Sequence, residues 1–345
     1  MRRTAVRALR PEESGTSATS GKPVPPPAGV AVVGLGNAGR QHLAAVDATP
    51  GARLAAVIET DQDRARWAGA AGLPVRTLEQ ALADPAVDLL AVCLPPGQRP
   101  PVTRAALAAG KHLLVEKLPA RDSAELRDLL RRATRAGLTT GVMFQHRYVL
   151  PEALRAGAAE RLADAAAVLL VSRPRSATHF RAGDWRSRPE IAVGGVTAHL
   201  GVHYLDIACQ LLGEPAEVTP LARADAAPGI DVQVCGHIRF ANGAHLTVTV
   251  TSRAAVRHEQ LTVLGERDWL SLLGGAVTGQ LDGQPIAEPA RPAAELRVEV
   301  YRELVAALRG GPPADLAALS RSAGVTAALD ALLARPAEVA AEVAG

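Results

Sequence analysis

The chain has 345 residues, a length that favours two domains over a single core. Its formal net charge is only +3, and the arginines are spread along the chain without a basic stripe that includes aromatic residues, so nucleic acid is not an expected partner. Hydrophobic residues make up 48% of the chain and aromatic residues 3%, and the abundant Ala, Val and Leu suit helices and buried parallel strands.

The first 28 residues predict a disordered tail. Paired arginines are followed by a stretch rich in Pro, Ser, Gly and Glu instead of the apolar run that a secretion signal needs. No apolar run approaches the length of a membrane span. The cysteines, Cys93, Cys209 and Cys235, are odd in number and far apart, so we expect a cytoplasmic protein with no disulfide framework.

From residue 29 to about residue 149, short apolar runs alternate with segments of helical spacing. The runs include GVAVV, ARLAAVI, VDLLAVCL and KHLLV, and they are apolar throughout rather than alternating with polar residues. This pattern is typical of a parallel sheet that is covered by helices on both faces. Ligands of such doubly wound sheets bind at the carboxyl ends of the strands.

The string GLGNAG follows the first of these runs and opens a helix. Gly34 permits a tight turn, Gly36 lets a pyrophosphate approach the backbone, and Gly39 lets helix and strand pack closely. Glu59 ends the second run twenty residues later, where a carboxylate can bind both ribose hydroxyls and repel a 2′-phosphate. The alternative is a glycine turn without a ligand and a plain surface acid. We favour an NAD-binding Rossmann domain over residues 29–149, with NADP the less expected cofactor.

After residue 150 the pattern changes to strands that alternate. In HLTVTVTS, Leu246, Val248 and Val250 face one way and the threonines face the other. Asn242-Gly243 predicts a hairpin between two of these strands, and the chain ends in helical segments. We therefore expect a C-terminal α/β domain over residues 150–345, with an open, mostly antiparallel sheet.

Lys117, in VEKLPA, follows the fourth apolar run directly. At that strand end it would lie over the cofactor crevice, where a lysine can bind a reacting hydroxyl and stabilise an alkoxide. A surface lysine without a catalytic role is the alternative.

The stretch HLGVHYLD, residues 199–206, places His199, His203 and Asp206 four and three residues apart, on one face of a helix. Three interpretations compete. Two histidines and an acid can chelate a metal, but the Glu of an HExxH motif and an obvious third ligand are both missing, so we predict no metal. Both imidazoles can be satisfied core residues. In the favoured reading, His203 transfers a proton while hydride leaves for NAD, with Asp206 orienting it or lying one turn deeper, and His199 binding substrate or tuning His203.

Trp185 and Arg186 stand on a loop before this helix. The tryptophan can stack on a sugar face, and the arginine can bind a phosphate or a hydroxyl. A loop anchor is the alternative for both residues.

The ordered set GLGNAGRQH, VIETDQDRA, LLAVCLPP, AALAAGKHLLVEK, GVMFQHRY and GGVTAHLGVHYLD resembles the Gfo/Idh/MocA family of sugar and cyclitol oxidoreductases. The resemblance runs from about residue 29 to the C-terminus. It implies a Rossmann domain, a C-terminal domain whose open sheet forms the oligomer interface, a nicotinamide cofactor, and a polyol, sugar or nucleotide-sugar substrate.

The resemblance also implies roles for single residues. Lys117 would lie beside the nicotinamide, His203 would be the general acid/base, and Arg147 would lie near the active site and bind substrate. The cofactor-binding residues would be Gly34, Gly36, Asn37, Ala38, Gly39, Glu59, Pro95, Glu116, Lys117 and Gln145.

The chain departs from the family pattern at three positions. Leu118 replaces the proline of an EKP motif, Arg99 stands where a histidine is usual, and His199 replaces an aspartate four residues before His203. The third change bears directly on proton transfer.

These observations predict a dehydrogenase that moves hydride between NAD and a secondary hydroxyl of a sugar, cyclitol or nucleoside-like substrate. A homodimer or homotetramer is expected, without a membrane or nucleic acid partner. A non-enzymatic NAD-binding sensor and a redox-neutral enzyme with transient hydride transfer are the alternatives.

Overall fold

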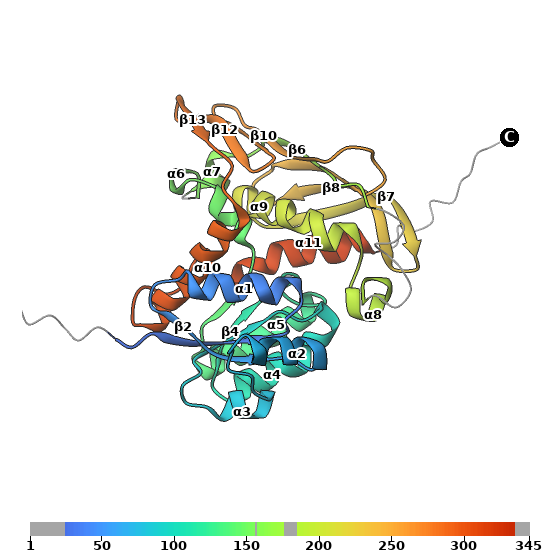
Figure 1. Ribbon diagram of the computed structural model, residues 1–345. Helices are drawn as coiled ribbons and strands as arrows, with labels where there is room; N and C mark the ends of the chain where they lie inside the picture. The colour runs from blue at the N-terminus through green and yellow to red at the C-terminus, as the bar shows by residue number, and fades with distance from the viewer. Residues whose placement is uncertain (1–24, 156, 176–184, 335–345) are drawn as a thin grey trace, which may run out of the picture.

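The computed structural model describes residues 25–155, 157–175 and 185–334 (Figure 1). The predicted tail therefore lies outside the described residues except for its last four positions, and Ala28 already belongs to the first strand. Two sheets lie one above the other in Figure 1, and the helices α9, α10 and α11 run between them.

The first sheet is parallel and has the strand order β2-β1-β3-β4-β5. Residues of β1 alternate between two cores, with Val30 and Val32 on one face and Ala31 and Val33 on the other. Both faces are thus buried, which is why the strands are apolar throughout. The strands are β1 (Ala28–Val33), β2 (Ala52–Ile58), β3 (Leu89–Val92), β4 (His112–Val115) and β5 (Thr140–Val142).

Helices connect and cover this sheet. The helix α5 shows how the sequence sets their ends, because Asp122 caps its first turn and Gly137 ends it in the left-handed conformation. The helices are α1 (Asn37–Asp47), α2 (Gln62–Ala70), α3 (Leu78–Ala83), α4 (Arg99–Ala108) and α5 (Ser123–Ala136), with 3₁₀ segments η1 (Pro96–Gln98) and η2 (Gln145–Val149).

The second sheet has eight strands in the order β13-β12-β11-β10-β6-β9-β8-β7. All neighbours are antiparallel except β6 and β9. The strands are β6 (Ala166–Ser172), β7 (Pro215–Ala227), β8 (Ile230–Phe240), β9 (His245–Thr251), β10 (His258–Leu264), β11 (Trp269–Leu273), β12 (Ala276–Leu281) and β13 (Gln284–Glu288). The predicted architecture of a Rossmann sheet plus a mostly antiparallel sheet is confirmed.

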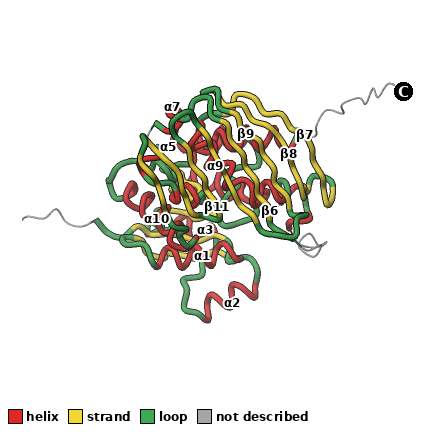
Figure 2. Tube along the Cα trace, turned by 90° about the horizontal axis from the view of Figure 1, so that it is seen from above, coloured by secondary structure: helices red, strands yellow, loops and turns green. Residues whose placement is uncertain are grey.

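One face of the second sheet is covered by helices and the other is open (Figure 2). As predicted, Leu246, Val248 and Val250 point to the buried face. Gly201 lies against this face, where a Cβ would come within 2.7 Å of a Val250 methyl group, so the helix approaches the sheet only because the residue is glycine. The helices are α6 (Glu152–Arg155), α7 (Ala158–Arg161), α8 (Pro189–Ala192), α9 (Val202–Leu212), α10 (Ala293–Leu308) and α11 (Ala323–Leu333), with 3₁₀ segments η4 (Trp185–Ser187) and η6 (Leu319–Ser322).

The helix α10 returns from the second sheet to the first. Its residues Val300, Tyr301 and Leu304 are buried in the same core as Val30 and Val32 of β1. The chain passes from one sheet to the other between β5 and β6, close to the predicted boundary at residue 150. The domain boundary at residue 150 stays a prediction. The helix α10, although it lies in the C-terminal half of the sequence, packs against the first sheet.

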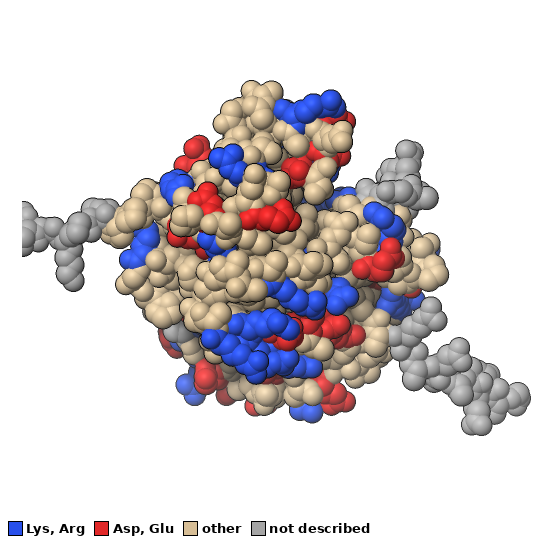
Figure 3. All heavy atoms as spheres, turned by 90° about the horizontal axis from the view of Figure 1, so that it is seen from below, with Lys and Arg blue, Asp and Glu red and all other residues tan. Residues whose placement is uncertain are grey.

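Charge on the surface is mixed. Seen from below, the side of the first domain shows a band of Lys and Arg side chains with Asp and Glu side chains beside it (Figure 3). Among the described residues, no helix is long and apolar enough to cross a membrane.

Candidate active site

The glycine turn between β1 and α1 has the geometry of a phosphate site. Gly34 has a φ of +89°, and a Cβ on Gly39 would lie 1.8 Å from the Gly34 carbonyl oxygen. Gly36 is exposed with open space around it and caps α1 without a side-chain hydrogen bond. The first N–H groups of α1, from Asn37 and Ala38 onward, therefore face a space that an anion can occupy.

Glu59 is fixed under this turn. Its carboxylate accepts hydrogen bonds from the Leu35 N–H at 2.7 Å and from Arg64 Nε at 2.9 Å, and its side chain is 5% exposed. Burial opposes ionisation, but the hydrogen bonds from Arg64 and from the backbone of Asp61 and Leu35 outweigh it and lower the pKa of Glu59. The ionised form of Glu59 is thus favoured at the edge of the glycine turn.

Lys117 lies where β4 ends and reaches the second domain. Its Nζ donates a hydrogen bond to the carbonyl oxygen of His199 at 2.8 Å. Burial, together with the positive charges of Arg99, Arg186 and Arg173, lowers the pKa of Lys117 to about 8, and Glu116 opposes this shift. The lysine is half-buried, and at neutral pH it therefore loses its proton more readily than a lysine in water does.

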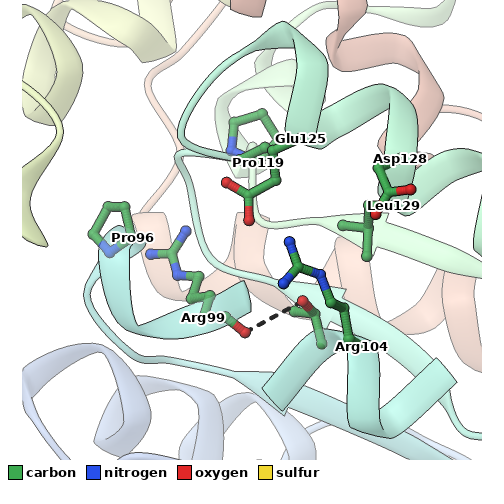
Figure 4. Close-up of a pocket in the computed structure, with 9 residues that line it drawn as sticks. Pro96, Arg99, Arg104, Pro119, Glu125, Asp128 and Leu129 are labelled. Carbon is green, nitrogen blue, oxygen red and sulfur yellow. Dashed lines mark hydrogen bonds between the residues drawn. The ribbon is translucent and has the colours of Figure 1, made fainter. Parts of the chain in front are cut away.

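Arg99 holds the segment that carries Lys117. Its guanidinium donates to the carbonyl oxygens of Leu94 at 2.7 Å and Lys117 at 2.9 Å, and also to those of Glu116 and Leu118. Figure 4 shows it at a hollow between α4 and α5, with Arg104 and Glu125 across from it. Arg99, which stands where the family usually has a histidine, thus connects the carboxyl ends of β3 and β4 through its hydrogen bonds.

Glu116 has its own partners in the protein. Its carboxylate contacts His42 Nε2 at 3.1 Å and the Lys117 N–H at 3.1 Å, and the other nitrogen of His42 contacts the Tyr301 hydroxyl at 2.7 Å. Burial opposes its ionisation, but the bond to His42 and the nearby Lys117 and Arg99 lower the pKa of Glu116 to about 2. This geometry gives Glu116 a part in positioning Lys117.

His199 and His203 enter the same space from the second domain. His199 lies in a π-helical turn, η5 (Thr197–Gly201), and His203 lies in the first turn of α9. Such π turns occur frequently at functional sites. Burial lowers the pKa of each imidazole well below its usual range, and Lys117 and other neighbouring cations add to the effect. Both imidazoles are therefore neutral at pH 7.

Trp185 and Arg186 lie beside His199. The Trp185 ring meets the His199 ring edge to face, with centroids 5.3 Å apart, and the Arg186 guanidinium stacks on Trp185 at 4.5 Å. The structure thus brings the predicted loop residues to the histidines.

Sequence reasoning missed three residues of this region. His146 lies 4.4 Å from His203 between ring centroids, and Thr197 and Arg297 are also buried there. A signal existed for His146, because it follows β5 at the carboxyl edge of the sheet. Nothing in the helical spacing around Arg297 indicated a site. Several buried polar atoms here lack a hydrogen-bond partner: Gln145 Oε1, His146 Nδ1, Thr197 Oγ1, His199 Nε2, His203 Nδ1 and Arg297 Nε.

Two of the predicted site residues pair with each other. Arg147, predicted to bind substrate, and Asp206, predicted either to orient His203 or to lie one turn deeper, form a buried ion pair with both hydrogen bonds at 2.7 Å, which favours the deeper position for Asp206. Arg147 also donates to the carbonyl oxygens of Leu316 and Ala318, and both members of the pair are at most 1% exposed. A further hydrogen bond from Arg147 to the Ser322 hydroxyl at 3.2 Å means that the pair connects η2, α9 and η6.

These features fit a dinucleotide. An open glycine turn, a carboxylate at the end of β2, and unpartnered polar atoms toward β4 and α9 lie where the pyrophosphate, ribose and nicotinamide of a bound cofactor would need them. Among the described residues, no group of three or more His, Cys, Asp or Glu side chains is placed to hold a metal ion.

The fold and the site define a two-domain protein with a Rossmann nucleotide-binding domain. Residues 28–144 match the oxidoreductase family with an NAD-binding Rossmann fold, and residues 150–271 match the GFO/IDH/MocA C-terminal domain. The chain belongs to the Gfo/Idh/MocA oxidoreductase family.

Individual relatives are more distant. The chain is 30% identical over 227 residues to a 1,5-anhydro-D-fructose reductase of Ensifer adhaerens, covering 61% of this chain and 66% of that protein. It is 35% identical over 204 residues to a putative UDP-kanosamine synthase oxidoreductase subunit of Amycolatopsis mediterranei, covering 54% and 52%. The chain thus spans about half to two thirds of the length of these relatives.

The solved structures share the fold. The WlbA dehydrogenase of Bordetella pertussis, solved with NADH and UDP-GlcNAcA, has a TM-score of 0.77 at 21% identity, over 89% of this chain and 94% of that chain.

The buried ion pair allows a test of whether Arg147 and Asp206 serve the fold. We predict that Arg147→Met lowers the free energy of unfolding by about 3–5 kcal/mol, because Asp206 is left charged and unpaired in the interior. The double variant Arg147→Met/Asp206→Leu should recover part of this loss. Urea denaturation measures both, with Arg131→Met as a control at an exposed pair, expected to change stability by less than about 0.5 kcal/mol. Unchanged stability together with lost activity would return Arg147 to the site.

Proposed function

We propose that the protein is an NAD-dependent dehydrogenase that acts on a secondary hydroxyl of a sugar-type substrate. The observation that carries the proposal is the hydrogen bond from Lys117 to the His199 backbone, which joins two domains next to the His199 and His203 imidazoles and a glycine turn with dinucleotide geometry. The substrate would lie beside His203 and Lys117, with Trp185 at the edge of its binding site, where the ring already contacts His199 and Arg186.

The residues divide the proton chemistry between them. Bound NAD would supply the hydride acceptor, so the chain's own residues must take up the hydroxyl proton. His203 is neutral and its Nδ1 has no partner, so it can accept that proton. Protonated Lys117 stabilises the developing alkoxide. His199, through its unpartnered Nε2, hydrogen-bonds a second hydroxyl and fixes the sugar's orientation. In the direction of ketone reduction, the same groups return the proton.

NAD is preferred over NADP in this proposal. Glu59 is a carboxylate whose ionised form the Arg64 and backbone hydrogen bonds favour, so it would repel a 2′-phosphate near the end of β2. Gln145, with a buried oxygen that lacks a partner, and Pro95 complete the cofactor contacts on the side of β3 and β5.

The direct test is reduction of NAD measured by absorbance, with a panel of aldoses, cyclitols, 1,5-anhydro sugars and UDP-sugars. We predict turnover that Lys117→Ala and His203→Ala each lower by about 10²–10⁴-fold with NADH affinity kept. NADP should give the slower rate. Arg131→Met, at an exposed pair on α5 of the first domain, is the control and should leave turnover unchanged. Firm NADH binding without turnover on any panel member would favour the sensor or the redox-neutral enzyme.

The pH dependence separates the roles of Lys117 and His203. Because Lys117 acts here as a cation with a pKa of about 8, kcat/KM for NAD reduction should fall as the pH rises through about 8. Lys117→Arg stays charged and should lose this fall. A rate that instead rises through pH 8 would make neutral Lys117 the base and contradict the assignment of His203.

We also propose that two copies pair through the open face of the second sheet. Exposed apolar side chains gather there on neighbouring strands: Val168, Leu170, Leu264, Trp269 and Leu273, each 37–54% exposed. Exposed apolar patches of this kind mark protein interfaces. Sedimentation velocity should show an oligomer that Val168→Asp shifts toward monomer. Val256→Asp changes a valine that is even more exposed, 65% against 54% for Val168, but lies in a loop, so it should not shift the equilibrium. A wild-type monomer would refute the pairing.

A further inference from the structure

Three arginines of the described residues are buried, and one of them has no partner. Arg99 donates to four carbonyl oxygens, and Arg147 pairs with Asp206. Arg297, on α10, is 7% exposed, its Nε is buried without a hydrogen-bond acceptor, and it forms no ion pair with any carboxylate of the described residues. A buried cation without an anion is costly, so its retention needs a reason.

The helix contacts place Arg297 near the glycine turn. Tyr301, one turn further along α10, contacts His42 of α1 at 2.7 Å. Val305 and Arg309, further on, lie against Gly51, just after the end of α1. The two helices therefore run in the same direction, and one turn back from Tyr301 brings Arg297 level with the beginning of α1. That beginning is where Gly36 leaves the N–H groups of α1 open.

The electrostatic neighbours of Arg297 lie on both sides of the site. Its charge acts on the Cys93 thiol, whose Cβ is 3.8 Å from the position that a Cβ on Gly39 would take. It also acts on the imidazoles of His146 and His203, whose rings contact each other on the side of the site that faces the second domain. The charge of Arg297 therefore acts both on a residue beside the phosphate turn and on the histidines, in agreement with its place on α10.

We propose that Arg297 is an anion-binding residue of the interdomain site, and that its guanidinium pairs with a phosphate or carboxylate group of a bound ligand. The inference rests on the proposed function. Two sources of the anion are compatible with its position: the pyrophosphate of the dinucleotide and an acidic group on the sugar substrate. In either case the ligand supplies the anionic partner that Arg297 does not have among the described residues.

The test begins with NADH titrations of the unmodified protein, Arg297→Met and Arg297→Lys, followed by fluorescence. If the cofactor supplies the anion, Arg297→Met should weaken NADH binding by about 10- to 100-fold, and Arg297→Lys should restore part of the loss. The control is Arg302→Met on the same helix, where the arginine is exposed and paired with Glu299, and NADH affinity should stay unchanged.

If Arg297→Met leaves NADH affinity unchanged, a second experiment tests whether the substrate supplies the anion. Thermal shifts are then measured with NADH present and with glucose, glucuronate or glucose 6-phosphate added. A shift by either acidic sugar that Arg297→Met abolishes assigns the anion to the substrate. Absence of any effect in both arms overturns the proposal. Failure of the unmodified protein to bind NADH would instead refute the proposed function, so the two failures are distinguishable.

Urea unfolding of the unliganded protein tests whether Arg297 has only a structural role. Removing an unpaired buried cation should leave the unliganded protein at least as stable as before, so Arg297→Met should unfold at an equal or higher urea concentration. A clear loss of stability in the unliganded variant would show that the guanidinium serves the fold and would overturn the assignment.

Discussion

The hydrogen bond from Lys117 to the carbonyl oxygen of His199 is the contact on which the site depends, because it joins the two domains at the point where the chemistry would occur. Each partner is held from its own side. Arg99 and Glu116 fix the segment around Lys117, and the π-helical turn that carries His199 rests on β9 at Gly201. Neither domain alone assembles the site.

Burial, together with positive charge, sets the protonation states in the candidate site. Lys117, Arg99 and Arg297 bring positive charge into a region that buries His146, His199 and His203, and Glu116 is the carboxylate paired within it. In such surroundings the imidazoles stay neutral and the lysine loses its proton more easily than in water. Strongly perturbed groups that gather in one place are typical of functional sites.

The sequence predicted what short-range rules determine. Apolar runs, the GLGNAG turn with Glu59, and the alternation around Leu246 were sufficient for the Rossmann sheet and for the main strands of the second sheet. The strand β7 escaped prediction because it is an edge strand whose Pro220 lies at a register shift, and such strands lack a clean pattern.

The sequence could not predict which side chains pair when they lie far apart along the chain. Asp206 has the helical spacing of a partner for His203, yet its carboxylate is bonded to Arg147, 59 positions away. A helical period gives the face of a helix but not what lies against it. Arg297 is invisible for the same reason, since only the packing of α10 on α1 brings it to the site.

The most direct test of the central claim is a crystal structure of the protein with NADH. We expect the pyrophosphate to lie on the turn from Gly34 to Gly39 and the nicotinamide ring to face the space between Lys117 and His203. A dinucleotide bound elsewhere, or a nicotinamide directed away from these two side chains, would contradict it.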